Sequence, residues 1–160
     1  MPDNDISLAQ GQMITAEAAT WEGTAYAMMG ARSAKGVTGD CSGTTWLIYK
    51  QAGFDFDYTT AAGFPAYAIS SGHFRKLGAG EAKRDGDILS WSGHMAIYCT
   101  FGADRAHATT QRPGRNGGKA WTQENDMWTA SRTGGPAYAP FAVKYWQTQP
   151  TAVFRYQKAR

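Results

Sequence analysis

The order of apolar and polar positions predicts helices in the first part of the chain. Residues 15–30 are rich in Ala, Met and Glu, which are good helix formers, and they end at a glycine. We therefore predict a helix there, broken near Gly23. Residues 31–39 hold two glycines and show no apolar period, which indicates a loop. A second helix is predicted to begin at or near Cys41, with a largely buried body over residues 42–51.

Short β-prone runs dominate the second part of the chain, after one more short helix predicted at residues 64–71. The sequence ILSWSGHMAIYCTF, residues 88–101, contains two such runs separated by a Ser-Gly pair, which is typical of a β-hairpin. Further strands are predicted at residues 105–110 and 151–157. Helices first and strands afterwards predict an α+β domain.

The size and charge of the chain narrow its class. With 160 residues, 42% of them hydrophobic, we expect one domain over residues 1–160, of which residues 1–12 are flexible. The formal charge of +3 comes from 16 basic and 13 acidic residues with no long run of either sign, so we expect no nucleic-acid partner. No apolar stretch approaches the roughly 20 residues that cross a bilayer, so we expect no membrane span.

The N-terminal sequence, MPDNDISLAQGQ, is acidic and polar. It lacks the basic start and the apolar middle of a secretory signal. We therefore expect that the protein has no signal peptide and is made in the cytoplasm, and that any export uses another route.

Cys41 is the first candidate for chemistry. A free cysteine often behaves as a small buried hydrophobe, and that interpretation needs no function. The first turn of a helix, however, presents unpaired N–H groups and the positive end of the helix dipole, which favour a thiolate. Position therefore makes Cys41 a candidate nucleophile, provided that a base lies elsewhere in the chain.

His94 is the candidate base. Strand alternation places His94, Ala96 and Tyr98 on one face and Met95, Ile97 and Cys99 on the other. If His94 faces Cys41, Cys99 points away from the site, so we interpret Cys99 as a core residue and expect no disulfide. A zinc site from two cysteines and two histidines fits the inventory, but the alternation and the lack of C-x-x-C or H-x-x-H spacing count against it.

His107 would lie on a neighbouring strand, where it could hydrogen-bond the far nitrogen of His94 and fix its tautomer. A Cys-His-His set of this kind suits acyl transfer, because the histidine returns a proton to the leaving amine. Backbone N–H groups around Cys41 and Ser42 would stabilise the oxyanion. The predicted chemistry is therefore cleavage of an amide bond.

Five short motifs follow one another in an order typical of one family: GTAY (23–26), DCSG (40–43), GDILSW (86–91), GHMAIY (93–98) and HA (107–108). In this order they resemble the NlpC-type papain-like cysteine peptidases, which are bacterial cell-wall endopeptidases. The resemblance implies a papain-like fold, with N-terminal helices packed on an antiparallel β-sheet. It also implies that no metal and no other cofactor is needed.

Carried over by residue, the resemblance implies that Cys41 is the nucleophile, His94 the general base and His107 its orienting residue. Tyr26 would assist at the oxyanion or hold the nucleophile, and Asp40 would shape the turn before Cys41. The implied substrate is the stem peptide of peptidoglycan, cut between D-glutamate and the diamino acid. The chain departs from the family at Ala25, where proline is usual, and in residues 28–39, which lack a common W-G-G pattern.

Several readings remain open beside this one. The chain is similar to the compact amidase effectors that bacteria inject into rivals by type VI secretion, which would deliver it to the periplasm of target cells and imply a cognate immunity protein. A phage lysin would look much the same. A CHAP amidase shares a cysteine followed by a G-H-x-A-I strand but usually lacks D-C-S-G. The fold could also serve as a catalytically dead module that binds peptidoglycan or a partner protein, although the intact Cys41, His94 and His107 argue against it.

Overall fold

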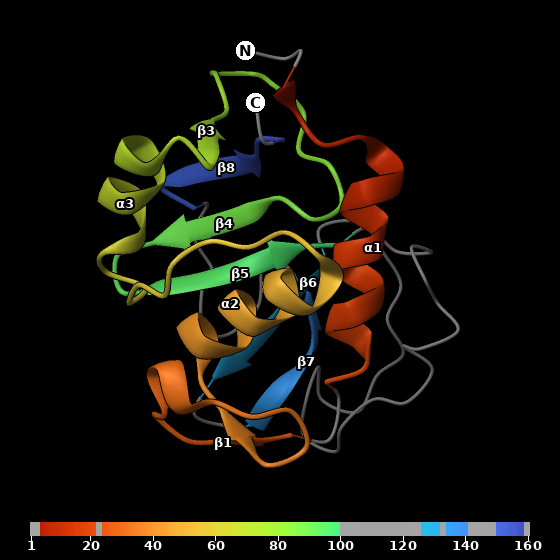
Figure 1. Cartoon of the computed structure of the whole chain (residues 1–160), viewed down its shortest axis with the longest axis vertical. Coiled ribbons are helices and arrows are strands. Elements are labelled where there is room, and N and C mark those ends of the chain that lie inside the picture. The colour runs from red at the N-terminus through yellow and green to blue at the C-terminus, as the bar shows by residue number, and fades with distance from the viewer. Residues whose placement is uncertain (1–3, 22–23, 100–125, 132–133, 141–149, 159–160) are drawn as a thin grey trace.

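The computed structural model describes residues 4–21, 24–99, 126–131, 134–140 and 150–158. For residues 19, 25 and 26, and for residues 126–131 and 134–140, the description concerns the backbone alone. Within these ranges the molecule is an α+β structure in which three α-helices accompany a six-stranded sheet (Figure 1). The predicted fold class is therefore confirmed. None of the helices in these ranges is long and apolar enough to cross a membrane.

Helix α1, Leu8–Ala19, differs from the helix predicted at residues 15–30. It begins earlier because Ser7 and Gln10 form a capping box, in which each side chain accepts the other residue's backbone N–H. It ends by Thr20, so the predicted helix is wrong over its second half. Strand β1, Ala25–Tyr26, and the 3-10 helix η2, Gly30–Arg32, lie there instead.

The other two predicted helices are confirmed. Helix α2, Cys41–Ala52, begins at the predicted cysteine and ends at Gly53, whose φ of 99° is the left-handed conformation that favours glycine after a helix. Helix α3, Phe64–Ser71, has the predicted bounds and carries a proline in its first turn.

The main sheet is antiparallel throughout, in the order β3-β8-β4-β5-β6-β7. Its strands are β3 (Phe74–Lys76), β4 (Ile88–Trp91), β5 (His94–Tyr98), β6 (Asp126–Ser131), β7 (Gly134–Pro140) and β8 (Ala152–Tyr156). The predicted hairpin is β4–β5, and the predicted strand near the C-terminus is β8. The strand predicted at residues 105–110 lies outside the described residues.

Helices α2 and α3 cover one face of this sheet. The ring of Phe64 in α3 packs 5.4 Å from that of Phe154, and Tyr49 of α2 packs on Phe74 and Tyr156. Phe154 pairs with Ile88, which pairs with Ile97, and cross-strand partners share a face. The helix-covered face therefore includes Ile97 and, two residues away, Met95, whereas His94, Ala96 and Tyr98 belong to the opposite face.

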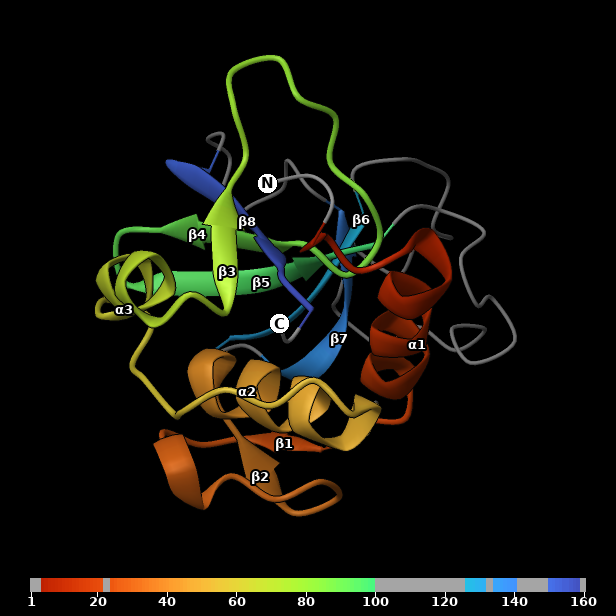
Figure 2. The same ribbon diagram turned by 45° about the horizontal axis from the view of Figure 1, so that its top comes forward.

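A second, two-stranded sheet lies beyond α2. Strand β1 pairs in parallel with β2, Thr38–Gly39, and Figure 2 shows both on the side of α2 that faces away from β4 and β5. The pair brings Tyr26 opposite Gly39, two residues before the start of α2.

The described part of the N-terminal segment is tied to the sheet, and the flexibility expected for residues 1–12 stays a prediction. Asp5 forms a β-bridge with Gln157, and both of its carboxylate oxygens accept N–H groups of Arg75, at 2.8 and 2.9 Å. Beneath it, Arg155 is paired through two hydrogen bonds with Asp87, and both side chains are buried. This ion-pair network joins the start of the chain, β3, β8 and the loop before β4.

Candidate active site

Cys41 is the first residue of α2, because Asp40 serves as the N-cap. Asp40 is extended, with φ of −114° and ψ of −176°, and its Oδ1 accepts the backbone N–H of Gly43 at 2.9 Å. This is the side-chain cap that aspartate supplies at a helix start. The half-buried thiol therefore lies at the end of the helix that carries free N–H groups.

The other oxygen of Asp40 holds η2 against the start of α2. Its Oδ2 accepts the N–H of Gly30 at 3.0 Å. Gly43 permits this close approach, because a Cβ at position 43 would overlap the carbonyl oxygen of Gly30 and the hydroxyl of Ser33. The contact between α2 and η2 thus explains two residues of the D-C-S-G sequence, Asp40 and Gly43.

The thiol of Cys41 contacts the edge of β5. The N–H of Tyr98 binds the carbonyl of Asp87 and the carbonyl of Tyr98 accepts from Gly86, so the even-numbered residues of β5 bond toward β4. The N–H of Met95 must therefore point to the opposite edge. On that edge the described part of the chain shows β6 paired with Ile97 and Tyr98, and the N–H of Met95 hydrogen-bonds the Cys41 sulfur.

Burial raises the pKa of the Cys41 thiol, which is opposite to the thiolate that the helix start alone predicts. The backbone N–H groups of Met95, Ser42 and Cys41 itself act in the other direction, and the negative charge of Asp40 raises the pKa further. Removal of the thiol from water outweighs the helix end. If Cys41 is a nucleophile, its resting form is thus a thiol, which needs a base to become reactive.

His94 is the first residue of β5, one residue before Met95. Strand β5 begins at the same end of the sheet as helix α2 does (Figures 1 and 2). His94 is buried, pairs across the hairpin with Trp91, and its ring lies 5.5 Å from the indole. Alternation places His94 on the sheet face opposite to α2, and Cys41 approaches β5 at its edge, beside Met95. That the imidazole of His94 reaches the thiol stays a prediction.

The structure describes some of the remaining predicted site residues in full, one by its backbone alone and one not at all. Ser42 is buried in the first turn of α2, and its Oγ lies 2.9 Å from the hydroxyl of Tyr58. The backbone of Tyr26 lies beside Gly39 through the β1–β2 pair. His107 lies outside the described residues, and its role stays a prediction. Tyr58 is a neighbour of the site that the sequence analysis missed, because it lies in a stretch without apolar period.

Cys99 is fully buried within the hydrophobic core, and neither it nor Cys41 forms a disulfide. Among the residues that the structure describes, no three histidine, cysteine or acidic side chains lie together as a metal site would need.

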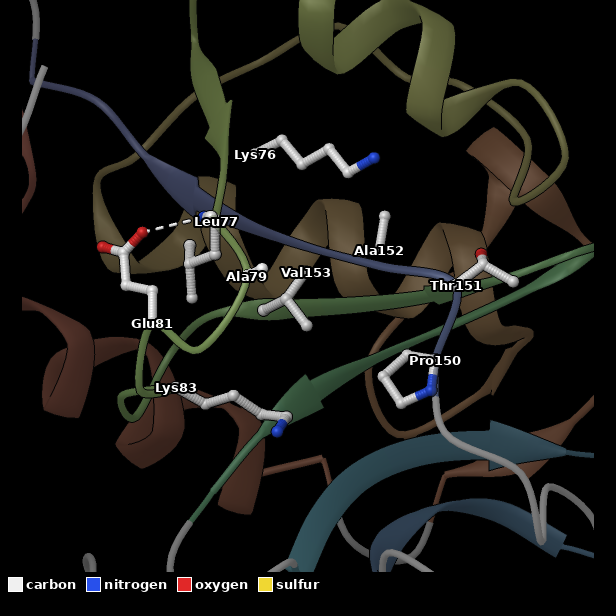
Figure 3. A pocket seen from close by; sticks show the side chains of 10 residues that line it. Lys76, Leu77, Ala79, Glu81, Lys83, Pro150, Thr151, Ala152 and Val153 are labelled. Carbon is white, nitrogen blue, oxygen red and sulfur yellow. Dashed lines mark hydrogen bonds between the residues drawn. The ribbon is translucent and has the colours of Figure 1, made fainter.

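A cavity of about 400 Å³ lies elsewhere, between the end of β3, the following loop and the start of β8. Figure 3 shows Lys76 on one side of it and Lys83 on the other, with Leu77 and Val153 between them. The carboxylate of Glu81 at its rim is bound by Arg75 and by the N–H of Gly78. The lining contains none of the predicted site residues, so we place the candidate active site at Cys41.

The sequence matches no model of a known protein family and no curated protein. The fold is similar to that of a solved structure from Staphylococcus aureus subsp. aureus Mu50, described as similar to a lipoprotein of the NLP/P60 family. The TM-score is 0.59 at 21% sequence identity, and the match covers 98% of this chain. It covers 44% of the staphylococcal chain, so this protein spans less than half the length of that relative.

Proposed function

We propose that the protein is a peptidoglycan hydrolase that cleaves an amide bond of the stem peptide with Cys41 as nucleophile. The observation that carries the proposal is the contact of the Cys41 thiol with the N–H of Met95, next to His94. The motif order and the fold similarity to an NLP/P60 structure support the substrate class. The bond we favour is that between D-glutamate and the diamino acid.

In the proposed reaction His94 takes the thiol proton as the sulfur attacks the carbonyl carbon. The carbonyl oxygen becomes an oxyanion, for which the N–H groups at the start of α2 are the available donors. The C–N bond then breaks, His94 gives its proton to the leaving amine, and a thioester remains on Cys41. Water hydrolyses the thioester, again with His94 as base, and releases the acid and the free thiol.

The raised pKa of the thiol suits this general-base sequence better than a preformed ion pair. A protonated thiol is inert to solvent oxidants and metals until a substrate carbonyl is positioned. His107 is proposed to orient His94, as in other triads. Delivery into the periplasm of target cells and a cognate immunity protein stay predictions from the sequence.

The test is digestion of purified peptidoglycan by three proteins: wild type, Cys41→Ala and Cys99→Ala. The released fragments are identified by mass spectrometry. We expect fragments that end between D-glutamate and the diamino acid from wild type and from Cys99→Ala, and none from Cys41→Ala. Cys99→Ala is the matched control, because it removes the other thiol of the chain from the core. Equal digestion by Cys41→Ala would refute the proposal.

A further inference from the structure

The phenol of Tyr58 is held by contacts from three directions beside the start of α2. Its hydroxyl lies 2.9 Å from Oγ of Ser42. Its ring meets that of Trp46 edge to face, with centroids 5.5 Å apart and planes at 75°. On the third side lies Gly30, where φ is +53° and an added Cβ would come within 2.9 Å of the phenolic oxygen. The hydroxyl is therefore aimed at Ser42 by the surrounding structure.

Trp46 is itself held in place by two contacts, and it therefore restricts the orientation of Tyr58. Its Nε1 donates to the carbonyl of Phe56 at 2.7 Å, two residues before Tyr58. Lys50, one turn further along α2, lies over the same indole at 5.4 Å. The indole thus connects α2 to the segment that carries Tyr58, and the phenol cannot swing away without breaking these contacts.

The direction of the hydrogen bonds follows from the number of protons available. Asp40 is an acceptor when ionised, and Ser42 donates to its Oδ1 through a long bond of 3.5 Å. Ser42 has one hydroxyl proton, which this bond uses. Either oxygen of the Ser42–Tyr58 pair can donate, and donation by Tyr58 is the arrangement that leaves the Ser42 proton for Asp40. The result is a chain from Tyr58 through Ser42 to Asp40, the residue that caps α2 and binds the N–H of Gly30.

We propose that Tyr58 is a positioning residue for the nucleophile, whose hydroxyl orients Ser42 and Asp40 on the two sides of Cys41. The assignment of Cys41 as nucleophile rests on the proposed function. Tyr58 acts by donating to Ser42, which strengthens the donation of Ser42 to Asp40, since hydrogen bonds in a chain polarise one another. The charge of Asp40 is then spread over more donors and acts less strongly on the neighbouring thiol.

The groups around the Cys41 thiol determine in which direction its pKa should change when the hydroxyl of Tyr58 is removed. Asp40 raises its pKa by its charge, and N–H groups of α2 and β5 lower it. His94 follows in β5, and Tyr58 lies behind Ser42. Loss of the phenolic hydroxyl leaves the charge of Asp40 less neutralised. The thiol of a Tyr58→Phe variant should then ionise at higher pH than that of the wild type.

The experiment measures the rate of alkylation of Cys41 by iodoacetamide as a function of pH, followed by mass spectrometry of the peptide that contains Cys41. For Tyr58→Phe we expect the midpoint of the pH dependence to rise by about half a pH unit, which makes alkylation at pH 7 roughly threefold slower. Tyr67→Phe is the matched control: its hydroxyl accepts the N–H of Asp57 in the same loop and touches no residue of the chain above. An unchanged midpoint in Tyr58→Phe would overturn the proposal.

A second variant separates positioning from loss of structure. In a Ser42→Ala background the chain is already broken, so Tyr58→Phe should cause no further shift of the midpoint. A shift of the same size in both backgrounds would show that Tyr58 acts by another route, and would also overturn the proposal.

Alkylation needs no peptidoglycan, so the two proposals fail separately. A shifted midpoint in a protein that cuts no peptidoglycan would leave the role of Tyr58 standing and remove the function. Hydrolysis that depends on Cys41, together with an unshifted midpoint, would leave the proposed function standing and remove the role of Tyr58.

Discussion

The sulfur of Cys41 accepts the backbone N–H of Met95, the residue that directly follows His94. Within the described residues, β6 pairs with the second half of β5, at Ile97 and Tyr98, and Met95 lies nearer to the start of the strand. The first turn of α2 lies beside Met95. The candidate nucleophile, Cys41, and the candidate base, His94, are thus linked through the backbone of β5, so the position of each depends on the sheet as well as on its own element.

The charge of Asp40 should hold back the ionisation of Cys41. In Asp40→Asn the charge is gone, so the pKa of the thiol should fall and alkylation at pH 7 should become about threefold faster. An asparagine can still cap α2, but its one oxygen cannot accept the N–H groups of Gly43 and Gly30 together. The free energy of unfolding, measured in urea, should therefore be lower by about 1–3 kcal/mol. Asp57→Asn, an exposed carboxylate, is the control. A slower reaction in Asp40→Asn would contradict the account.

Gly43 should tolerate no side chain, although it lies inside a helix. Alanine is preferred to glycine there by about 1 kcal/mol on helix propensity alone. The Cβ would nevertheless overlap Gly30 and Ser33, so Gly43→Ala should lower the free energy of unfolding by about 1–3 kcal/mol and reduce hydrolysis. Chemical denaturation of Gly43→Ala beside Lys50→Ala, an exposed position on the same helix, measures this. Greater stability of Gly43→Ala would show that η2 does not press on α2.

The ion-pair network around Arg75 should stabilise the protein above about pH 4. Arg75 lowers the pKa of Glu81 to about 2 and holds that of Asp5 well below its usual range, although burial of Asp5 acts in the opposite direction. Both folded values lie below the unfolded ones, near 4, so this stabilisation is complete above the unfolded values and is lost as the pH falls toward 2.

Arg75→Met tests this sign. At pH 7 the variant should be less stable than wild type by about 1–3 kcal/mol, because Asp5 loses a two-point, charge-assisted contact. The difference should shrink in urea titrations at pH 4 and again at pH 2.5. Lys76→Met, the next residue along β3, is the control. A difference that stays constant across this range would mean that the network contributes nothing through its charges.

Features set by a few adjacent residues could be predicted from the sequence. The start of α2 follows from the cap at Asp40, and the β4–β5 hairpin follows from two β-prone runs around a Ser-Gly turn. The capping box at Ser7 and Gln10 is equally local, and composition without this box places the first helix too late in the chain.

Features that depend on distant pairing could not be predicted in this way. Strands β1 and β2 have two residues each, too few to show any period, and they exist because they pair with each other. Alternation in β5 correctly separated His94 from Met95, but which face α2 covers is decided by Phe64 and Tyr49 packing on β3 and β8. The contact of Tyr58 with Ser42 joins residues 16 apart through a loop and leaves no local signal.

The central claim is that the Cys41 thiol performs the reaction, and one measurement tests it most directly. Wild-type protein is treated with increasing amounts of iodoacetamide, and the fraction of Cys41 alkylated and the residual hydrolysis of peptidoglycan are measured on the same samples. Because Cys99 is fully buried, the reagent should modify Cys41 first. We predict that hydrolysis falls in proportion to the modified fraction of Cys41 and reaches zero when it is complete. Hydrolysis that persists with Cys41 fully alkylated would contradict the account.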